Sequence, residues 1–302
     1  MALDTDTLSQ FLDALDRFVK ERLIPYEDRV ADEDVIPPML VDEIRTMGLF
    51  GMSIPEDFGG LGLSMIEEVQ AAFVLGQASP AFRSLVGTNN GIGSQGIIID
   101  GTDEQKAKYL PALASGDMIA SFALTEPDAG SDAGGLRTTA RRDGNDFLLN
   151  GTKRYITNAP RADLFTVFAR TSPEVKGSAG VSAFLVEAGT PGITLGQPDR
   201  KMGQKGSHTC DVILDNVRVP ASNIIGGPDR LNKGFKTAMK VLDRGRLHIS
   251  AVCVGAAERL IRDSLSYAIE RKQFGEPIAE KQLIQAMLAD SRAEAFAARC
   301  MI

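Results

Sequence analysis

The feature that most constrains the fold is a change in hydrophobic spacing along the chain. In the stretch 8–24, apolar residues recur every three or four positions, which predicts an amphipathic helix, and similar spacing continues to about residue 115. Over 119–214 the apolar residues instead form short runs rich in β-branched and aromatic types. Turn pairs such as Asp143-Gly144 and Asn150-Gly151 separate these runs. Helical spacing returns from about residue 231, so the order is helices, strands, helices.

Strands that follow one another without intervening helices favour an antiparallel sheet. We therefore predict an α+β chain with an N-terminal helical domain over 1–117, a central antiparallel β-sandwich or barrel over 118–227, and a C-terminal helical domain over 228–302. The apolar positions of the last helix continue to Ile302 without a Gly or Pro stop signal. We expect that the C-terminal domain is truncated, or that its last helices pack on a neighbouring subunit.

Composition excludes several classes of protein. A net charge of −7 lacks the basic excess of a nucleic-acid binder. We expect no membrane span, because no apolar run approaches the ~18 residues that a span needs. The N-terminus lacks the pattern of a secretory signal, so we expect a cytoplasmic protein. With three scattered cysteines and two histidines, we expect no metal site. A Ser-His-Asp hydrolase would depend on one of those two histidines.

A glycine pattern at 91–96 (GIGSQG) fits the dinucleotide-binding fingerprint, and Asp117 follows about 20 residues later. That fingerprint requires a preceding strand and a βαβ unit. The segment 103–115 that follows is predicted to be a helix. We therefore interpret the glycines as small residues for helix packing.

Two segments of the predicted β-region form a candidate ligand site. Segment 122–132 (FALTEPDAGSD) is an apolar strand that ends in a turn, where Gly130 would let a ligand approach the backbone closely. Segment 150–159 (NGTKRYITNA) places Tyr155 and Thr157 two residues apart, and therefore on one face of a strand. An aromatic ring beside a hydrogen-bond donor suits a flat heterocycle. Taken singly, the first segment is equally well interpreted as an ordinary turn, and the second is better interpreted as a plain hairpin.

Two further segments lie on the predicted C-terminal helices. Asp243 and Arg246 are three positions apart on one helix, which by spacing alone suits a surface ion pair. Segment 271–275 (RKQFG) ends that helix, where basic residues commonly interact with the helix dipole.

Six segments together, in this order, resemble the acyl-CoA dehydrogenase family. They are SIPEDFGGLG at 53–62, FALTEPDAGSD at 122–132, NGTKRYITNA at 150–159, KMGQKGSHT at 201–209, DRGR at 243–246 and ERKQFGEPIAEKQ at 270–282. The resemblance spans essentially the whole chain, and the family has the same helical–β–helical layout.

The resemblance implies a flavoprotein that binds FAD between the β-domain and the C-terminal helices. It would oxidise an acyl-CoA thioester to the trans-2-enoyl-CoA and pass the electrons to an electron-transfer flavoprotein. Alternatives are an acyl-CoA oxidase or flavin monooxygenase of the same fold, and a non-catalytic subunit that binds flavin or acyl-CoA. Reading the coding sequence past Ile302 would test the last alternative. The length or branching of the acyl chain is not readable from the sequence.

The resemblance also implies three groups of site residues. Those expected to hold FAD from within the chain are Phe122, Leu124, Thr125, Gly130, Ser131, Tyr155 and Thr157. Those expected to bind the CoA portion of the substrate are Ser131, Asp243 and Arg246. Those expected to contact the FAD of a neighbouring subunit, in a homodimer or homotetramer, are Arg271, Gln273, Phe274 and Gln282.

Two positions depart from the pattern of the family. Tyr155 stands where Trp is usual, and it keeps an aromatic face for stacking. Gly245 occupies the position that carries the catalytic glutamate in a minority of members, and glycine has no group that could accept a proton. Most members carry this glutamate beyond the position of Ile302. We therefore expect the general base outside this chain and assign no catalytic residue within it.

Overall fold

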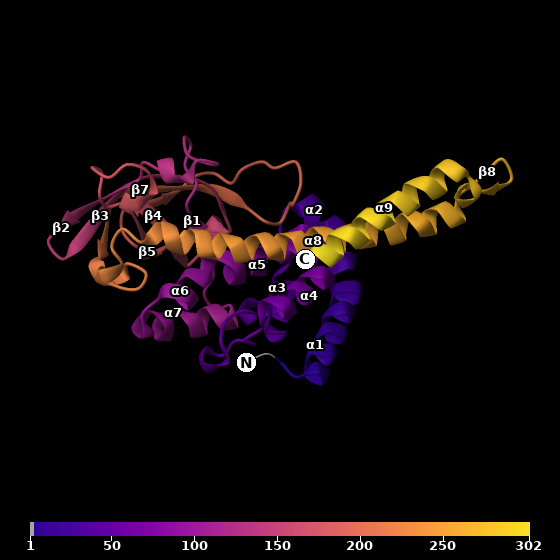
Figure 1. Ribbon diagram of the computed structural model, residues 1–302, viewed down its shortest axis with the longest axis horizontal. Coiled ribbons are helices and arrows are strands. Elements are labelled where there is room, and N and C mark those ends of the chain that lie inside the picture. Colours follow the sequence, from indigo (N-terminus) through magenta and orange to yellow (C-terminus); the bar gives the residue numbers. More distant parts are fainter. Residues whose placement is uncertain (1–2) are drawn as a thin grey trace.

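The computed structural model describes residues 3–302 and contains helices, then strands, then helices, as the sequence predicts (Figure 1). The N-terminal helices are α1 (Thr5–Phe18), α2 (Glu27–Glu33), α3 (Pro38–Thr46), α4 (Met65–Leu75), α5 (Pro80–Thr88), α6 (Gln95–Asp100) and α7 (Asp103–Ser115). A π-helical segment, Asn89–Gly93, links α5 to α6. Side-chain caps fix the start of several of these helices. At α4, for example, Ser64 and Glu67 form a capping box.

The central strands form one seven-stranded sheet. They are β1 (Ala120–Ala123), β2 (Thr139–Asp143), β3 (Asp146–Thr157), β4 (Leu164–Arg170), β5 (Val181–Glu187), β6 (Ile193–Leu195) and β7 (Thr209–Pro220). Their order is β1-β4-β2-β3-β7-β6, and β5 pairs with β4. The pairs β2–β3, β3–β7, β4–β5 and β6–β7 are antiparallel.

The fold class predicted from the sequence is confirmed, with one addition to the topology. β1 and the first residue of β2, Thr139, pair in parallel with β4. The hairpin β2–β3 lies between β1 and β4 in the chain and reverses its direction twice, so that β4 runs in the same direction as β1.

Two irregularities bend the long β3–β7 ladder, between Leu149 and Gly151 and between Lys153 and Ile156. At the second, β3 has one more residue than β7, which defines a β-bulge. Tyr155 lies in this bulge with a φ of 57°, in the left-handed region. The bulge therefore alters the direction of the Tyr155 side chain.

Helix α8 (Gly234–Glu270) connects the helical part to the sheet. The backbones of α8 and α4 approach closely at Gly255. A Cβ at this position would lie 2.1 Å from the carbonyl oxygen of Phe73 on α4, so only glycine fits there. Near the start of α8, a Cβ at Gly234 would lie 2.2 Å from the backbone nitrogen of Ala183 on β5. One continuous helix thus contacts both layers.

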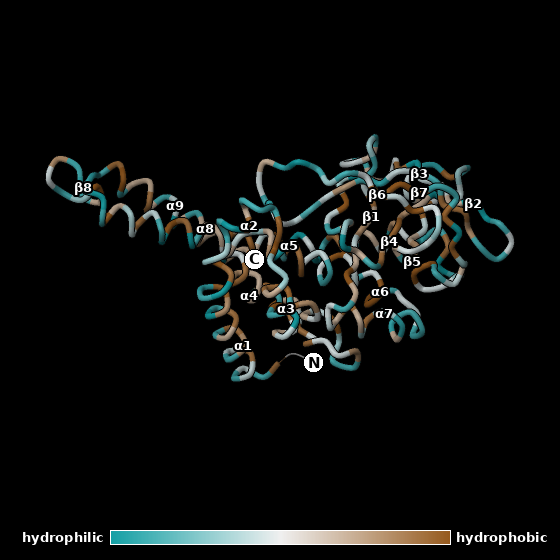
Figure 2. Tube along the Cα trace, turned by 180° about the vertical axis from the view of Figure 1, so that it is seen from behind, coloured by the Kyte–Doolittle hydropathy of each residue, from teal (hydrophilic) through white to brown (hydrophobic). Residues whose placement is uncertain are grey.

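The second half of α8 and helix α9 (Gln282–Met301) form a hairpin that projects from the rest of the chain (Figures 1 and 2). The short strands β8 (Lys272–Gln273) and β9 (Glu276–Pro277) lie at its tip. Figure 2 shows apolar segments along this hairpin. Its large exposed apolar side chains include Leu260, Tyr267, Phe274, Leu283, Phe296 and Met301. Within residues 3–302, no helix combines the length and apolar character that crossing a membrane requires.

The glycine pattern at 91–96 lies on helical segments, and no strand precedes it. A Cβ at Gly93 would lie 2.7 Å from the Cβ of Ala120 on β1. The interpretation as packing residues therefore holds for Gly93 and for Gly96, where a Cβ would lie 3.1 Å from Ile225 Cδ1, but not for Gly91, where a Cβ would meet no atom within 4 Å.

Candidate active site

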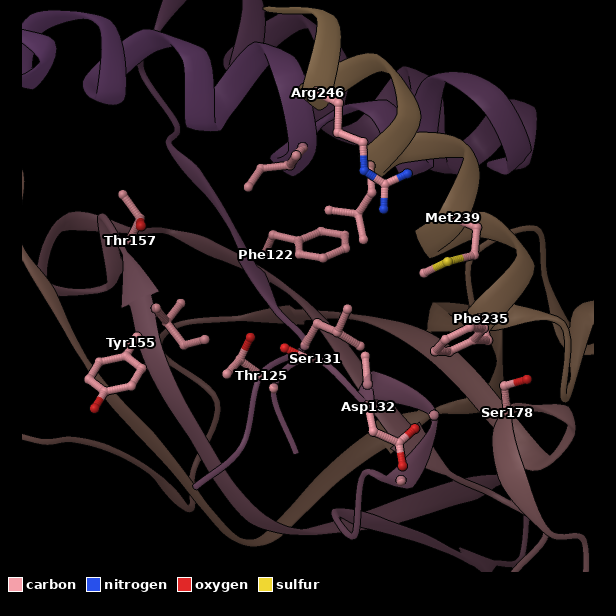
Figure 3. Close-up of a pocket in the computed structure, with 18 of the residues that line it drawn as sticks. Phe122, Thr125, Ser131, Asp132, Tyr155, Thr157, Ser178, Phe235, Met239 and Arg246 are labelled. Carbon is pink, nitrogen blue, oxygen red and sulfur yellow. The ribbon is translucent and has the colours of Figure 1, made fainter. Parts of the chain in front are cut away.

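A pocket of about 880 Å³ lies between the sheet and the first half of α8 (Figure 3). Its walls come from α5 and the π-helical segment, the turn after β1, the end of β3, the segment after β4, and α8. The lining residues are Thr88, Ile92, Phe122, Leu124, Thr125, Gly130–Gly135, Tyr155, Ile156, Thr157, Arg170, Gly177, Ser178, Phe235, Met239, Leu242 and Arg246. All seven residues that were expected to hold FAD from within the chain are among them.

A buried ion pair shapes the turn after β1. Lys153, which is fully buried, donates to Glu126 Oε1 at 2.7 Å and to the carbonyl oxygen of Leu124 at 3.2 Å. The Glu126 carboxylate also accepts from the backbone N–H groups of Arg137 and Thr138, at 2.6 and 2.9 Å. The pair therefore joins both ends of the turn to β3.

The pKa values of this pair show how burial and charge compete. Burial lowers the pKa of Lys153 to about 8, although the carboxylate of Glu126 opposes that change. Burial alone would raise the pKa of Glu126, but Lys153 and the hydrogen bonds from the turn hold it below the ordinary value. Both side chains lie within the motif segments, and the sequence analysis assigned them no role. The signal that could have revealed this buried pair in the sequence is Lys153, a lysine on an otherwise apolar face of β3.

Several hydroxyl-bearing residues line the pocket, and among them are Thr125, Ser131 and Thr157. Within the part of the chain that the structure describes, none of these hydroxyls forms a hydrogen bond with another protein group. By contrast, the nearby hydroxyl of Ser121 donates to the carbonyl oxygen of Thr157 at 2.8 Å. The three free hydroxyls can therefore donate to a polar ligand or accept from it.

Tyr155 and Thr157 both line the pocket, but the bulge at Tyr155 breaks the alternation from which a shared face was predicted. Figure 3 shows that the ring of Tyr155 points away from the centre of the labelled group. The guanidinium of Arg154 lies over this ring, 4.8 Å from its centroid, and Tyr155 is 58% exposed. Tyr155 therefore lies at the rim of the pocket, while Phe122 lies deeper, next to Phe168 with ring centroids 4.8 Å apart.

Helix α8 contributes a wall that the sequence analysis did not assign, except at Arg246. Phe235, Met239 and Leu242 lie at helical spacing ahead of Arg246, so that all four line the pocket from one side of α8. Figure 3 shows Phe235, Met239 and Arg246 on this wall. This spacing was visible in the sequence, but spacing alone does not tell a pocket wall from a core face. Asp243 does not line the pocket, and its carboxylate accepts from Arg246 Nη1 at 2.5 Å.

The third group of predicted site residues lies far from this pocket. Arg271, Gln273 and Phe274 are at the tip of the projecting hairpin, and Gln282 begins α9 (Figure 1). All four are exposed, and Phe274 is 96% exposed. The single chain does not bring these residues together with the pocket.

Among the described pocket-lining residues, Asp132 is the one carboxylate, and its side chain is exposed. Gly245 lies on α8 between Leu242 and Arg246, where a Cβ would meet Ile92 Cγ2 at an ordinary 3.5 Å. No group of three or more His, Cys, Asp or Glu residues that could hold a metal ion occurs in residues 3–302.

Comparisons with known proteins agree with this architecture. Three domains of one family match in chain order: the acyl-CoA dehydrogenase N-terminal domain over residues 5–117, the middle domain over 121–217 and the C-terminal domain over 232–302. The chain therefore belongs to the acyl-CoA dehydrogenase family, a family of flavoprotein oxidoreductases.

An acyl-CoA dehydrogenase of Bacillus subtilis is 40% identical over 285 residues, which are 94% of this chain and 74% of the relative. Among solved structures, butyryl-CoA dehydrogenase from Megasphaera elsdenii matches with a TM-score of 0.92 and 34% identity, over 99% of this chain and 78% of that one. A glutaryl-CoA dehydrogenase from Mycobacterium smegmatis in complex with FADH2 has a TM-score of 0.88 and 34% identity, over 98% and 75% of the two chains.

Proposed function

We propose that this protein binds FAD in the pocket beside α8 and oxidises an acyl-CoA thioester to the trans-2-enoyl-CoA. The observation that carries this proposal is the convergence of three separate motif segments, 122–132, 150–159 and 243–246, on one pocket. Membership of the acyl-CoA dehydrogenase family supports it, as does the FADH2 bound in a similar structure.

The residues of the pocket fit a flavin. Its volume of about 880 Å³ lies within the ~300–1,000 Å³ range of small-molecule sites. Apolar side chains, among them Phe122 and Leu124, offer a surface for a flat ring, and the free hydroxyls of Thr125, Ser131 and Thr157 offer hydrogen bonds at its edges. When bound, FAD supplies the acceptor for the hydride that leaves the β-carbon.

The other residues of the pocket would position the substrate. Arg246 points from α8 toward the pocket and carries a positive charge for the CoA portion, and Asp243 holds its guanidinium through an ion pair. Ser131, on the turn after β1, lines the pocket and would contact both ligands. Loss of the α-proton needs a carboxylate opposite the flavin. Because Asp132 is exposed and position 245 is glycine, we infer that this base comes from outside residues 3–302.

The tip of the projecting hairpin would complete the cofactor site of a second subunit. Arg271, Gln273, Phe274 and Gln282 are exposed and distant from the pocket of their own chain, so they would contact the FAD of a neighbour in a homodimer or homotetramer. Electrons would leave the reduced cofactor for an electron-transfer flavoprotein.

Anaerobic bleaching of the flavin tests the function. The FAD-loaded protein, in a form that supplies the base inferred to lie outside residues 3–302, is mixed with butyryl-CoA, and absorbance near 450 nm is followed. Acyl-CoA-dependent bleaching is expected of that form, and little bleaching is expected of residues 1–302 alone. A protein that holds FAD and the base but is bleached by no acyl-CoA, straight-chain or branched, would contradict the dehydrogenase function. Oxygen consumption, compared with dye reduction, separates an oxidase from a dehydrogenase.

A further inference from the structure

The residue that follows Thr157 connects the end of β3 to two other parts of the chain. Asn158 is 2% exposed, and its backbone has a φ of 63°, in the left-handed region. Its side-chain Nδ2 donates to the carbonyl oxygens of Ser84 and Leu85 on α5, each at 3.2 Å. Its backbone N–H donates to the carbonyl oxygen of His208 at 2.8 Å. Asn158 therefore joins β3 to α5 and to the segment before β7.

Two features fix Asn158 in one conformation. Few residues with a side chain adopt a positive φ, and asparagine is among those that tolerate it best. Both partners of its side chain are carbonyl oxygens, which only accept hydrogen bonds, so the NH2 group of the amide must face them. An amide that is buried and uses both of its N–H donors in this way cannot turn without leaving them unpaired.

The carbonyl group of Thr157 is held as well. Ser121 on β1 is fully buried, and its hydroxyl donates to the carbonyl oxygen of Thr157 at 2.8 Å. Thr157 is thus held at two points, its own carbonyl and the residue that follows it. Each of these contacts crosses from β3 to another element, so the position of Thr157 depends on how β1 and α5 pack around the end of β3.

Packing alone does little to hold the side chain of Thr157. It lines the pocket of about 880 Å³, and it also lines a second cavity of about 320 Å³ whose walls include Ser84 and Gln204. A side chain that borders two cavities has fewer of the close contacts that fix side chains in a protein core. The hydrogen bonds of Ser121 and Asn158 therefore carry more of the restraint on this residue.

We propose that Asn158 is a positioning residue that places the hydroxyl of Thr157 at the edge of the flavin ring. This inference rests on the FAD site proposed above. A hydrogen bond weakens steeply when its geometry is poor, so a hydroxyl contributes at the flavin edge only where its backbone is held. Hydrogen bonds to the ring also tune the redox potential of a flavin. Asn158 does not line the pocket, and it acts through Thr157.

The test removes the amide and keeps the backbone conformation. Asn158→Gly can retain a positive φ, because glycine has no Cβ, and it loses both hydrogen bonds to α5. The matched control is Asn216→Gly. Asn216 has a φ of 52°, is exposed and does not line the pocket. Titration with FAD gives the affinity, and reduction by dithionite beside a reference dye gives the midpoint potential of the bound flavin.

Thr157→Ala supplies the comparison that separates positioning from stability. Asn158→Gly should weaken FAD binding roughly 2- to 10-fold, the range for one neutral hydrogen bond, and should shift the midpoint potential in the same direction as Thr157→Ala. In a Thr157→Ala background the same change should have almost no further effect on either quantity, because the hydroxyl is already absent. Asn216→Gly should change neither.

Ser121→Ala tests the same claim in a second variant. It frees the carbonyl of Thr157 and leaves the contacts of Asn158 with α5 in place. It should change the affinity and the midpoint potential in the same direction as Asn158→Gly, and it should likewise have almost no effect once Thr157 is alanine.

Two results would overturn this inference and leave the FAD site standing. Losses that add fully in the double variants would show that Asn158 and Ser121 only stabilise the fold. An unchanged affinity and potential in both Asn158→Gly and Ser121→Ala would show that other contacts hold Thr157. A native protein that binds no FAD would contradict the proposed site and this inference with it. Because these measurements need bound FAD but no turnover, non-additive losses in a protein that no acyl-CoA bleaches would support the inference and contradict the dehydrogenase function.

Discussion

Replacing Lys153 by methionine should destabilise the protein and loosen the flavin pocket together. The substitution keeps the apolar length of the side chain and removes the ammonium that Glu126 contacts at 2.7 Å. Breaking a buried pair by removing one partner costs ~3–5 kcal/mol. Glu126 keeps two backbone donors, from Arg137 and Thr138, so we expect a value near the low end, about 3 kcal/mol. This lowers the ratio of folded to unfolded chain roughly a hundredfold.

Urea unfolding followed by far-UV circular dichroism measures this change, because the chain contains no Trp to report by fluorescence. Lys236→Met, at an exposed position on α8, is the matched control and should change stability little. The double variant Lys153→Met/Glu126→Gln should lose less stability than the sum of the two single variants, since each single variant leaves one buried charge unpaired and the double variant leaves none. A Lys153→Met protein as stable as the control, with unchanged affinity for FAD, would refute the proposed role of the pair.

Three further predictions concern the hairpin, the base and the buried histidine. Arg271→Ala should weaken both FAD retention and the oligomer, measured by flavin release and light scattering; unchanged values for both would make Arg271 only a helix-terminal charge. In residues 1–302 alone, Gly245→Glu places a carboxylate where a Cβ has space beside pocket-lining Ile92, and it should raise the rate of acyl-CoA-dependent bleaching roughly a hundredfold; no increase would show that a carboxylate at position 245 does not reach the substrate. Burial and the charges of Arg83 and Arg244 lower the pKa of His248 to about 3, so between pH 6.5 and 3 the unfolded chain binds a proton that the folded chain does not. Acidification through this range should therefore lower the free energy of unfolding. Urea unfolding at pH 7 and pH 5 should show a smaller decrease in this free energy for His248→Gln than for the native protein. An equal decrease in both proteins would show that His248 does not contribute to the pH dependence of stability.

The sequence predicts the layer order and much of the pocket for a physical reason. Changes in hydrophobic spacing mark the change from helix to strand, and the turn after β1 is rich in residues that favour turns. The side chains of Thr125, Ser131 and Thr157 are therefore placed by local structure that can be read from the chain. All three line one pocket.

Features that depend on distant contacts were not predictable in the same way. The ring of Tyr155 points toward the rim because β3 has a bulge there, and simple alternation along a strand does not reveal a bulge. Arg83 and His248 are 165 positions apart, and only the packing of α5 against α8 brings them together. The parallel β1–β4 pair likewise depends on the path of the chain between those strands.

Titration of the FAD-free protein with FAD tests the central claim most directly, namely that the motif segments build one flavin pocket. Quenching of flavin fluorescence gives the affinity and the stoichiometry. We predict about one FAD per chain. Each of Thr125→Ala, Ser131→Ala and Thr157→Ala should weaken binding, whereas Ser115→Ala, on the exposed end of α7, should not. Absence of FAD binding, or binding that none of the three pocket variants weakens, would contradict the account.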